Sequence, residues 1–158
     1  MRSLYLVGAM LTTLPTLVAA DSVLSSKVTK HVQAATTACA EFFTSGQDLS
    51  VLENVGFDRV RQDYVWDTRV PSNTRERMTV TATTESGKCN VQLSRATRQD
   101  SRDLNDIMTD AFVRRGFKVE PVASRRFDLT SGDQKLRLVG FVHKKTDVQS
   151  ASVTVYRR

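Results

Sequence analysis

One arrangement occurs twice in this sequence and constrains its fold more than any other feature. An apolar helical pattern ends at Gly56-Phe57, and a second ends at Gly116-Phe117, sixty residues later. Glycine adopts the left-handed conformation found at many helix ends, and the phenylalanine after it can pack back onto the last turn, as in a Schellman cap. About twenty residues after each pair, two strand-like segments flank a polar turn. We therefore predict two helix-plus-meander halves. Their common ancestry is a hypothesis, because the halves share little sequence identity.

The clearest strand signal lies between the two Gly-Phe pairs. Residues 78–83 and 89–94 both alternate apolar and polar side chains, and the turn sequence "ESGK" separates them. Such alternation is typical of a hairpin with one apolar and one polar face. Further strands are predicted from β-forming residues and turn chemistry over residues 64–70, 125–130, 135–143 and 150–157.

Three helices are predicted from apolar residues at steps of three and four. The first covers residues 22–43 and places Cys39 on its apolar stripe. A short helix follows, capped by Asp48 or Ser50. The third covers residues 101–115, and Asp100 or Ser101 together with Asp103 suits its N-terminus.

The order of these elements is helix, short helix, strands, helix, strands. This order predicts an α+β fold: a twisted antiparallel sheet of about five to six strands, with the helices packed on one face. A doubly wound α/β fold is disfavoured, because helices do not alternate with single strands.

The apolar pattern changes phase within the strand predicted over residues 135–143. Leu136 and Leu138 stand in one phase, whereas Val139 and Phe141 stand in the other. Glycine in a strand often marks a bulge, and a bulge at Gly140 would return Phe141 to the core. We therefore expect a bulge at Gly140 and a buried Phe141.

The first twenty residues have the three parts of a secretory signal peptide. Arg2 supplies the positive start, residues 4–11 are uncharged and apolar, and Val18-Ala19-Ala20 supplies small residues before the cleavage point. We expect cleavage after residue 20, a periplasmic or secreted product with a single α+β domain over residues 21–158, and no membrane span in that product.

Cys39 and Cys89 are the two cysteines of the chain, so only one pairing exists. An exported chain favours a disulfide, which would connect the first helix to the sheet. Closing a loop of about 50 residues contributes ~4 kcal/mol in the loop-entropy model. We predict no metal site, because these cysteines and the distant His31 and His143 lack ligand spacing.

The charge excess is moderate. Without Arg2 the chain has 22 basic and 17 acidic residues, a net charge of +5. A solvated basic surface explains this excess, and so does contact with an anionic partner.

Sequence motifs for catalysis are absent. The chain has no glycine-rich phosphate loop, no G-x-S-x-G elbow and no H-E-x-x-H helix. Asp103, Asp106 and Asp110 share one side of the predicted helix, away from its apolar stripe, which indicates a solvated polar face. We therefore predict no catalytic residue and no cofactor. The alternative function is a small hydrolase-like enzyme that uses His143 or His31 with nearby carboxylates.

One face of the predicted sheet is the candidate binding surface. Arg126 and Arg137 belong to the face opposite the apolar residues of their strands. The polar residues expected beside them are Thr79, Thr81, Thr83, Asn90, Gln92, Thr154 and Tyr156. Such a face can bind an acidic protein edge or a polysaccharide, although antiparallel sheets also commonly leave one face in water.

We expect the partner to be another exported protein or an anionic envelope component. A module for anionic polymers is the second alternative. Nucleic acid is disfavoured, because the sequence lacks the interleaved aromatic residues on which single strands stack.

Overall fold

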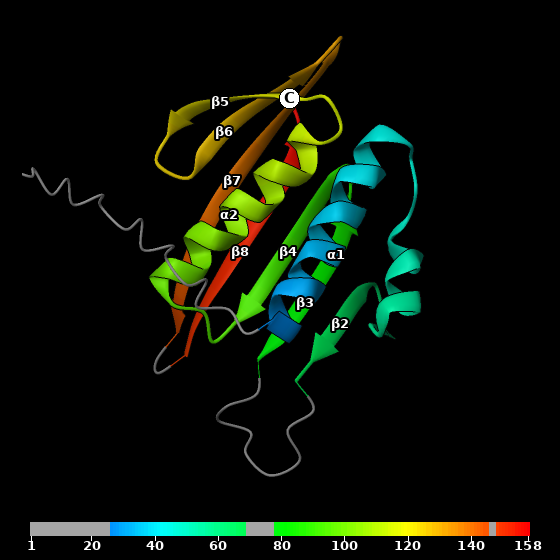
Figure 1. Ribbon diagram of the computed structural model, residues 1–158, viewed down its shortest axis with the longest axis vertical. Helices are drawn as coiled ribbons and strands as arrows, with labels where there is room; N and C mark the ends of the chain where they lie inside the picture. The colour runs from blue at the N-terminus through cyan, green and yellow to red at the C-terminus, as the bar shows by residue number, and fades with distance from the viewer. Residues whose placement is uncertain (1–25, 69–77, 146–147) are drawn as a thin grey trace, which may run out of the picture.

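The fold is a sheet with its helices on one side (Figure 1). The computed structural model describes residues 26–68, 78–145 and 148–158, so the predicted signal peptide lies outside the described residues. The helices are α1 (Ser26–Thr44), the 3₁₀ helix η1 (Leu49–Val55) and α2 (Arg98–Val113). None of the helices within the described residues combines the length and apolar character that crossing a membrane requires.

The sheet contains eight strands, and every neighbouring pair is antiparallel. The strands are β1 (Asp58–Val60), β2 (Asp63–Asp67), β3 (Thr79–Glu85), β4 (Lys88–Ser94), β5 (Lys118–Ala123), β6 (Arg126–Ser131), β7 (Gln134–Lys145) and β8 (Val148–Arg157). Their spatial order is β1-β2-β3-β4-β8-β7-β6-β5. The predicted class, helices on an antiparallel sheet, is confirmed, but the predicted number of five to six strands is too small.

The two strands without a distinct sequence signal, β1 and β5, form the two edges of the sheet. β1 has three residues, all exposed, and β5 contains Pro121 and is exposed along most of its length. Short, exposed strands and proline are usual at sheet edges, because an edge pairs on one side only and needs no buried face. The alternation that indicates a half-buried strand is therefore missing from both.

The strand order divides the sheet into two halves of the same topology. In the first half α1 and η1 precede the meander β1–β4, and in the second half α2 precedes the meander β5–β8. The halves meet where β4 pairs with β8. Helix plus four-stranded meander thus occurs twice, with η1 as an additional element in the first half.

Both Gly-Phe pairs end a helix in the same way. Gly56 has φ 91° and Gly116 has φ 81°, while Phe57 and Phe117 are buried. In each pair the glycine N–H donates to the carbonyl three residues back and the phenylalanine N–H to the carbonyl five residues back, which is the Schellman pattern. The acceptors are Glu53 and Leu52 in the first half and Val113 and Phe112 in the second.

The disulfide between Cys39 and Cys89 is present, with the two Cα atoms 5.6 Å apart. Both cysteines are fully buried. Because Cys39 lies on α1 and Cys89 on β4, the disulfide connects the first helix to the sheet, as predicted.

The start of α2 differs from the prediction. The helix begins at Arg98, and its N-cap is Thr97, not Asp100 or Ser101. The Thr97 hydroxyl accepts from the Asp100 N–H, and the Asp100 carboxylate accepts from the Thr97 N–H. This is a capping box with Asp at the third helical position, where Glu or Gln is more usual.

The predicted bulge at Gly140 is wrong, and so is the predicted burial of Phe141. β7 pairs with β8 in continuous register from Leu136 to Lys145, and Phe141 is 45% exposed. Gly140 continues the buried phase of Leu136 and Leu138 and lies under α2. A Cβ at this position would come within 2.2 Å of Asn105 Oδ1, so glycine is needed here for close packing of the helix.

Candidate functional site

The open face of the sheet, opposite α1 and α2, carries all nine residues predicted for the binding surface. They alternate along their strands with side chains that point toward the helices, most of them buried. The nine residues are Thr79, Thr81, Thr83, Asn90, Gln92, Arg126, Arg137, Thr154 and Tyr156. The register makes Arg137 the neighbour of Tyr156 and Thr81 the neighbour of Gln92. Arg126 lies on β6 and Thr79 on β3, with three strands between them.

Hydroxyl groups on the open face are partly satisfied by their own neighbours. Thr83 donates to Asp63 Oδ1 over 2.9 Å, and Thr154 donates to Asn90 Oδ1 over 3.0 Å. Thr79 donates to Ser94 Oγ over 2.8 Å. These cross-strand bonds stabilise the pairing of the strands. They also reduce the hydrogen-bonding capacity that these threonines offer to a partner.

Arg137 is engaged by an acidic neighbour. Its guanidinium donates to both carboxylate oxygens of Asp128, over 2.8 and 3.2 Å, and Arg158 also donates to Asp128. Hydrogen bonding from Arg137 lowers the pKa of Asp128, and the bond to Asp128 raises the pKa of Arg137. Arg137 therefore contributes little free positive charge to the open face.

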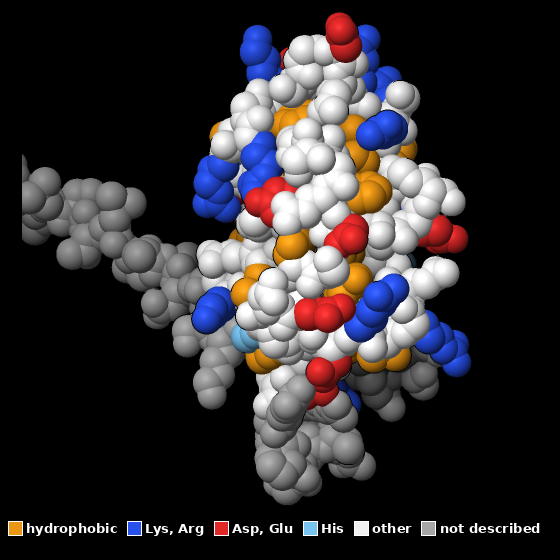
Figure 2. Space-filling view, turned by 90° about the vertical axis from the view of Figure 1, so that its right-hand side faces the viewer, with side chains coloured by type: hydrophobic (Ala, Val, Ile, Leu, Met, Phe, Trp, Pro, Cys, Tyr) orange, Lys and Arg blue, Asp and Glu red, His pale blue; other side chains and the backbone are white. Residues whose placement is uncertain are grey.

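Arg126 and Lys88 supply unpaired positive charge on this face. Both side chains are exposed, and neither forms an ion pair with any residue that the structure describes. On the side of the molecule that bears η1 and β2, basic and acidic side chains are interspersed (Figure 2).

The centre of the open face is hollowed. We call the depression lined by Lys88, Phe141, Thr154 and Tyr156 the central hollow; its volume is about 310 Å³. It shares Lys88 and Thr154 with a second depression of about 350 Å³. Phe141 was not among the predicted binding residues. The alternation of Leu136, Leu138 and Gly140 could have placed it on the open face, but the glycine was interpreted as a bulge.

The two histidines of the enzyme alternative lie in different surroundings. His143 Nε2 is 3.2 Å from the Ser152 hydroxyl, and its ring stacks beside Phe141. Ser152 is only 5% exposed, and no described carboxylate is ion-paired with His143. His31 lies flat against Trp66, with ring centroids 3.8 Å apart. The described residues around His143 do not form a catalytic triad, in which hydrogen bonds connect a nucleophile, a base and an orienting acid.

The acidic residues of α2 do not form a metal centre among the described residues. Asp106 and Asp110 are exposed, and Asp103 is half-buried. Partial burial raises the pKa of Asp106, and the neighbouring Asp103 and Asp110 raise it further.

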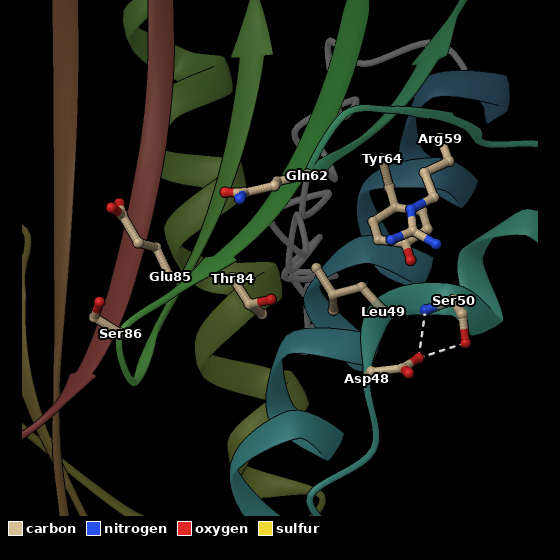
Figure 3. A pocket seen from close by; sticks show the side chains of 9 residues that line it. All are labelled: Asp48, Leu49, Ser50, Arg59, Gln62, Tyr64, Thr84, Glu85 and Ser86. Atoms are coloured by element: carbon tan, nitrogen blue, oxygen red, sulfur yellow. Dashed lines mark hydrogen bonds between the residues drawn. The ribbon is translucent and has the colours of Figure 1, made fainter.

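Another hollow lies at the edge of the sheet, beside β1 and β2, and has a volume of about 540 Å³ (Figure 3). We call it the edge hollow. It is lined by Asp48, Leu49, Ser50, Arg59, Gln62, Tyr64, Thr84, Glu85 and Ser86. These residues come from three separate segments, which no sequence motif connects.

Comparison of the chain with protein-family models, with curated proteins and with solved structures found no match.

Proposed function

We propose that this chain is an exported binding protein that captures an acidic exported protein on the open face of its sheet. The signal-peptide pattern of residues 1–20 supports export. The disulfide supports it as well, because structural disulfides persist mainly in oxidising compartments.

The observation that carries the proposal is the composition of the central hollow. Phe141 is 45% exposed and lines the central hollow together with Tyr156 and Lys88. Aromatic residues dominate the binding energy of many protein interfaces, where they fill pockets at the centre of the contact. An unpaired cation at the same place favours a partner with a carboxylate near its apolar anchor.

Arg126 extends this surface toward β6. It lies across from Val139 on β7, which itself neighbours Thr154 of the central hollow. A partner that covers the central hollow and reaches Arg126 would contact two cations that form no ion pair with a described residue, although the charge of Arg126 also acts on Asp128. Charged residues at the rim of an interface mainly accelerate association.

Site-specific photo-crosslinking tests the proposal. A photoreactive phenylalanine analogue replaces Phe141 in the oxidised chain from Asp21 onward. This protein is then irradiated in an extract of exported proteins. The control carries the same group at Val113, which is 50% exposed on α2. We expect one acidic exported protein to be crosslinked from position 141 and not from 113. Lys88→Glu should weaken that capture about tenfold, as removal of a charged contact does.

Identical products from both positions, or no product from position 141, would refute the open face as the binding surface.

Binding measured at increasing salt concentration distinguishes an acidic protein from an anionic polymer. Polymer binding should fall steeply with salt because bound counterions are released, whereas an apolar anchor is much less sensitive. Steep loss, with retention on a heparin column, would favour the polymer alternative.

A further inference from the structure

Most of the edge hollow lies on the helix side of the sheet. Arg59, Tyr64 and Thr84 belong to the phase of their strands that points toward the helices, as their neighbours in register show. The start of η1, with Asp48 and Ser50, forms the opposite wall (Figure 3). Near the β3–β4 turn the edge hollow adjoins the open face, because Glu85 lines both this hollow and the second open-face depression.

A nearly buried tyrosine presents an unused hydroxyl in the edge hollow. Tyr64 is only 8% exposed, so its ring is held by the surrounding core. No described residue is hydrogen-bonded to its hydroxyl, and Figure 3 shows the hydroxyl end directed toward Leu49 and Ser50. The hydroxyl is not among the buried unpaired polar atoms, so it is accessible from the hollow although its ring is buried. A phenol hydroxyl both donates and accepts hydrogen bonds, so it can bind a ligand that enters the hollow.

Two charged side chains of opposite sign face the hollow without forming an ion pair. Asp48 and Arg59 both line it, and neither forms an ion pair with a described residue. Glu85 also lines it, but its register position belongs to the open face, and Figure 3 shows its carboxylate directed away from Asp48 and Arg59. Both hydrogen bonds from Ser50 to Asp48 end on Oδ1, so Oδ2 remains free to accept. The side-chain and backbone hydrogen bonds from Ser50 lower the pKa of Asp48, and the charge of Arg59 acts in the same direction. This carboxylate is therefore ionised at neutral pH.

The chemistry of the lining selects one class of ligand. The carboxylate of Asp48 and the guanidinium of Arg59 balance in charge, which favours a neutral ligand, and the buried Leu49 is the only aliphatic side chain of the lining. Carboxylates only accept hydrogen bonds, a guanidinium only donates them, and hydroxyl and amide groups do both. A ligand that satisfies this mixture needs many groups that both donate and accept. Sugar hydroxyls have this property, and bonds to charged residues strengthen such contacts.

From this arrangement we infer that the edge hollow is a binding site for a neutral saccharide. Its volume of about 540 Å³ is within the usual range for small-molecule sites. The disulfide supports the site, because Cys89 is paired across the hairpin with Thr84, a lining residue. The β3–β4 turn is thus attached to α1, which reduces the cost of ordering the site when a ligand binds.

Titration followed by NMR tests the inference on the oxidised ¹⁵N-labelled chain from Asp21 onward. The neutral probes are maltotriose, cellotriose and chitotriose, and glycylglycine represents a zwitterion. We expect at least one trisaccharide, at millimolar concentration, to shift the amides of residues 48–50, 59–64 and 84–86. Tyr64→Phe should weaken this binding about threefold to tenfold, the usual effect of one hydrogen bond.

Tyr156→Phe is the matched control, since it removes a hydroxyl from the open face and should leave saccharide affinity unchanged. Three outcomes would overturn the inference. These are no shift with any trisaccharide, shifts of the same amides with glycylglycine only, and saccharide binding that depends on Tyr156 and not on Tyr64.

Discussion

The two halves of the molecule share one topology but hold their helices to the sheet differently. In the first half α1 is attached to β4 by the Cys39–Cys89 disulfide, and its buried Thr36 hydroxyl donates to the Gln33 carbonyl. In the second half α2 has no covalent link to the sheet. Its buried Ser101 Oγ and Asn105 Oδ1 are hydrogen-bonded to no described residue.

This difference concerns local stability more than architecture. Unsatisfied buried polar groups cost free energy that an apolar contact does not. A segment with such groups opens at a lower free energy than the rest of the molecule. We therefore expect α2 to separate from the sheet more readily than α1, although both helices cover the same face.

Removing the disulfide should have the largest effect on this comparison. The double substitution Cys39→Ser with Cys89→Ser frees a loop with a sequence separation of 50. We expect a loss of about 4 kcal/mol in the free energy of unfolding, because the unfolded chain regains the entropy that the crosslink removed. Denaturant unfolding in oxidising and reducing buffer measures the loss. An unchanged midpoint in reducing buffer, with the thiols shown to be free, would contradict a structural disulfide.

Hydrogen exchange then locates the effect within the fold. In the oxidised protein we expect the amides of α1 to exchange more slowly than those of α2. In the serine variant most of this difference should disappear, so that both helices exchange at similar rates. Equal protection of the two helices in the oxidised protein would refute the proposed difference between the halves.

Gly140→Ala should have the next largest effect and should act on the second half. The added Cβ meets the Asn105 carboxamide, whose Oδ1 would be 2.2 Å away. Overpacking of this kind costs about 1–3 kcal/mol, and we expect faster exchange in α2 with little change in α1. The double variant Gly140→Ala with Asn105→Ala should recover stability relative to Gly140→Ala alone. Additive losses in this double-mutant cycle would show that the two residues do not interact.

Substitutions at the two caps should have smaller and equal effects. Gly56→Ala and Gly116→Ala both place a side chain in the left-handed conformation, and no atom lies within 4 Å of either added Cβ. The cost is therefore that of the backbone alone, about 1–2 kcal/mol each. Thermal unfolding of the two variants measures it. Unequal losses would show that the caps, like the helices, differ between the halves.

The smallest effect concerns pH and lies in the second half. Because the pKa of Asp128 is lowered in the folded state, the carboxylate stabilises the fold above its unfolded pKa, near 4. This contribution is lost as the pH falls through the lower, folded-state value. Asp128→Asn should thus be less stable than the original chain at pH 7 and lose less stability on acidification. Parallel acid-unfolding curves for the two proteins would exclude this contribution.

Features that depend on residues close together in the chain can be predicted from the sequence. The two glycine caps, the hairpin of β3 and β4, and the apolar stripe of α1 all follow from local periodicity and turn chemistry. The open face followed from the same alternation, since a strand that buries one set of side chains exposes the other.

Features that depend on distant contacts were missed or misinterpreted. Gly140 is a glycine because Asn105 packs against it, which a strand pattern alone cannot distinguish from a bulge. The edge strands β1 and β5 lack a buried face, so they lack alternation. The edge hollow combines three segments whose proximity is created by the fold, and its key residue, Tyr64, has no distinctive sequence context.

The junction between the halves has a further consequence. The halves are joined in the sheet by the β4–β8 pairing, with seven residue pairs from Lys88 with Tyr156 to Ser94 with Ser150. The disulfide lies entirely within the first half, and only Arg95, Ala96 and Thr97 connect β4 to α2. Two copies of the chain could therefore exchange halves by domain swapping, with each disulfide intact and every strand pairing preserved. The short connection between β4 and α2 would serve as the hinge of such an exchange.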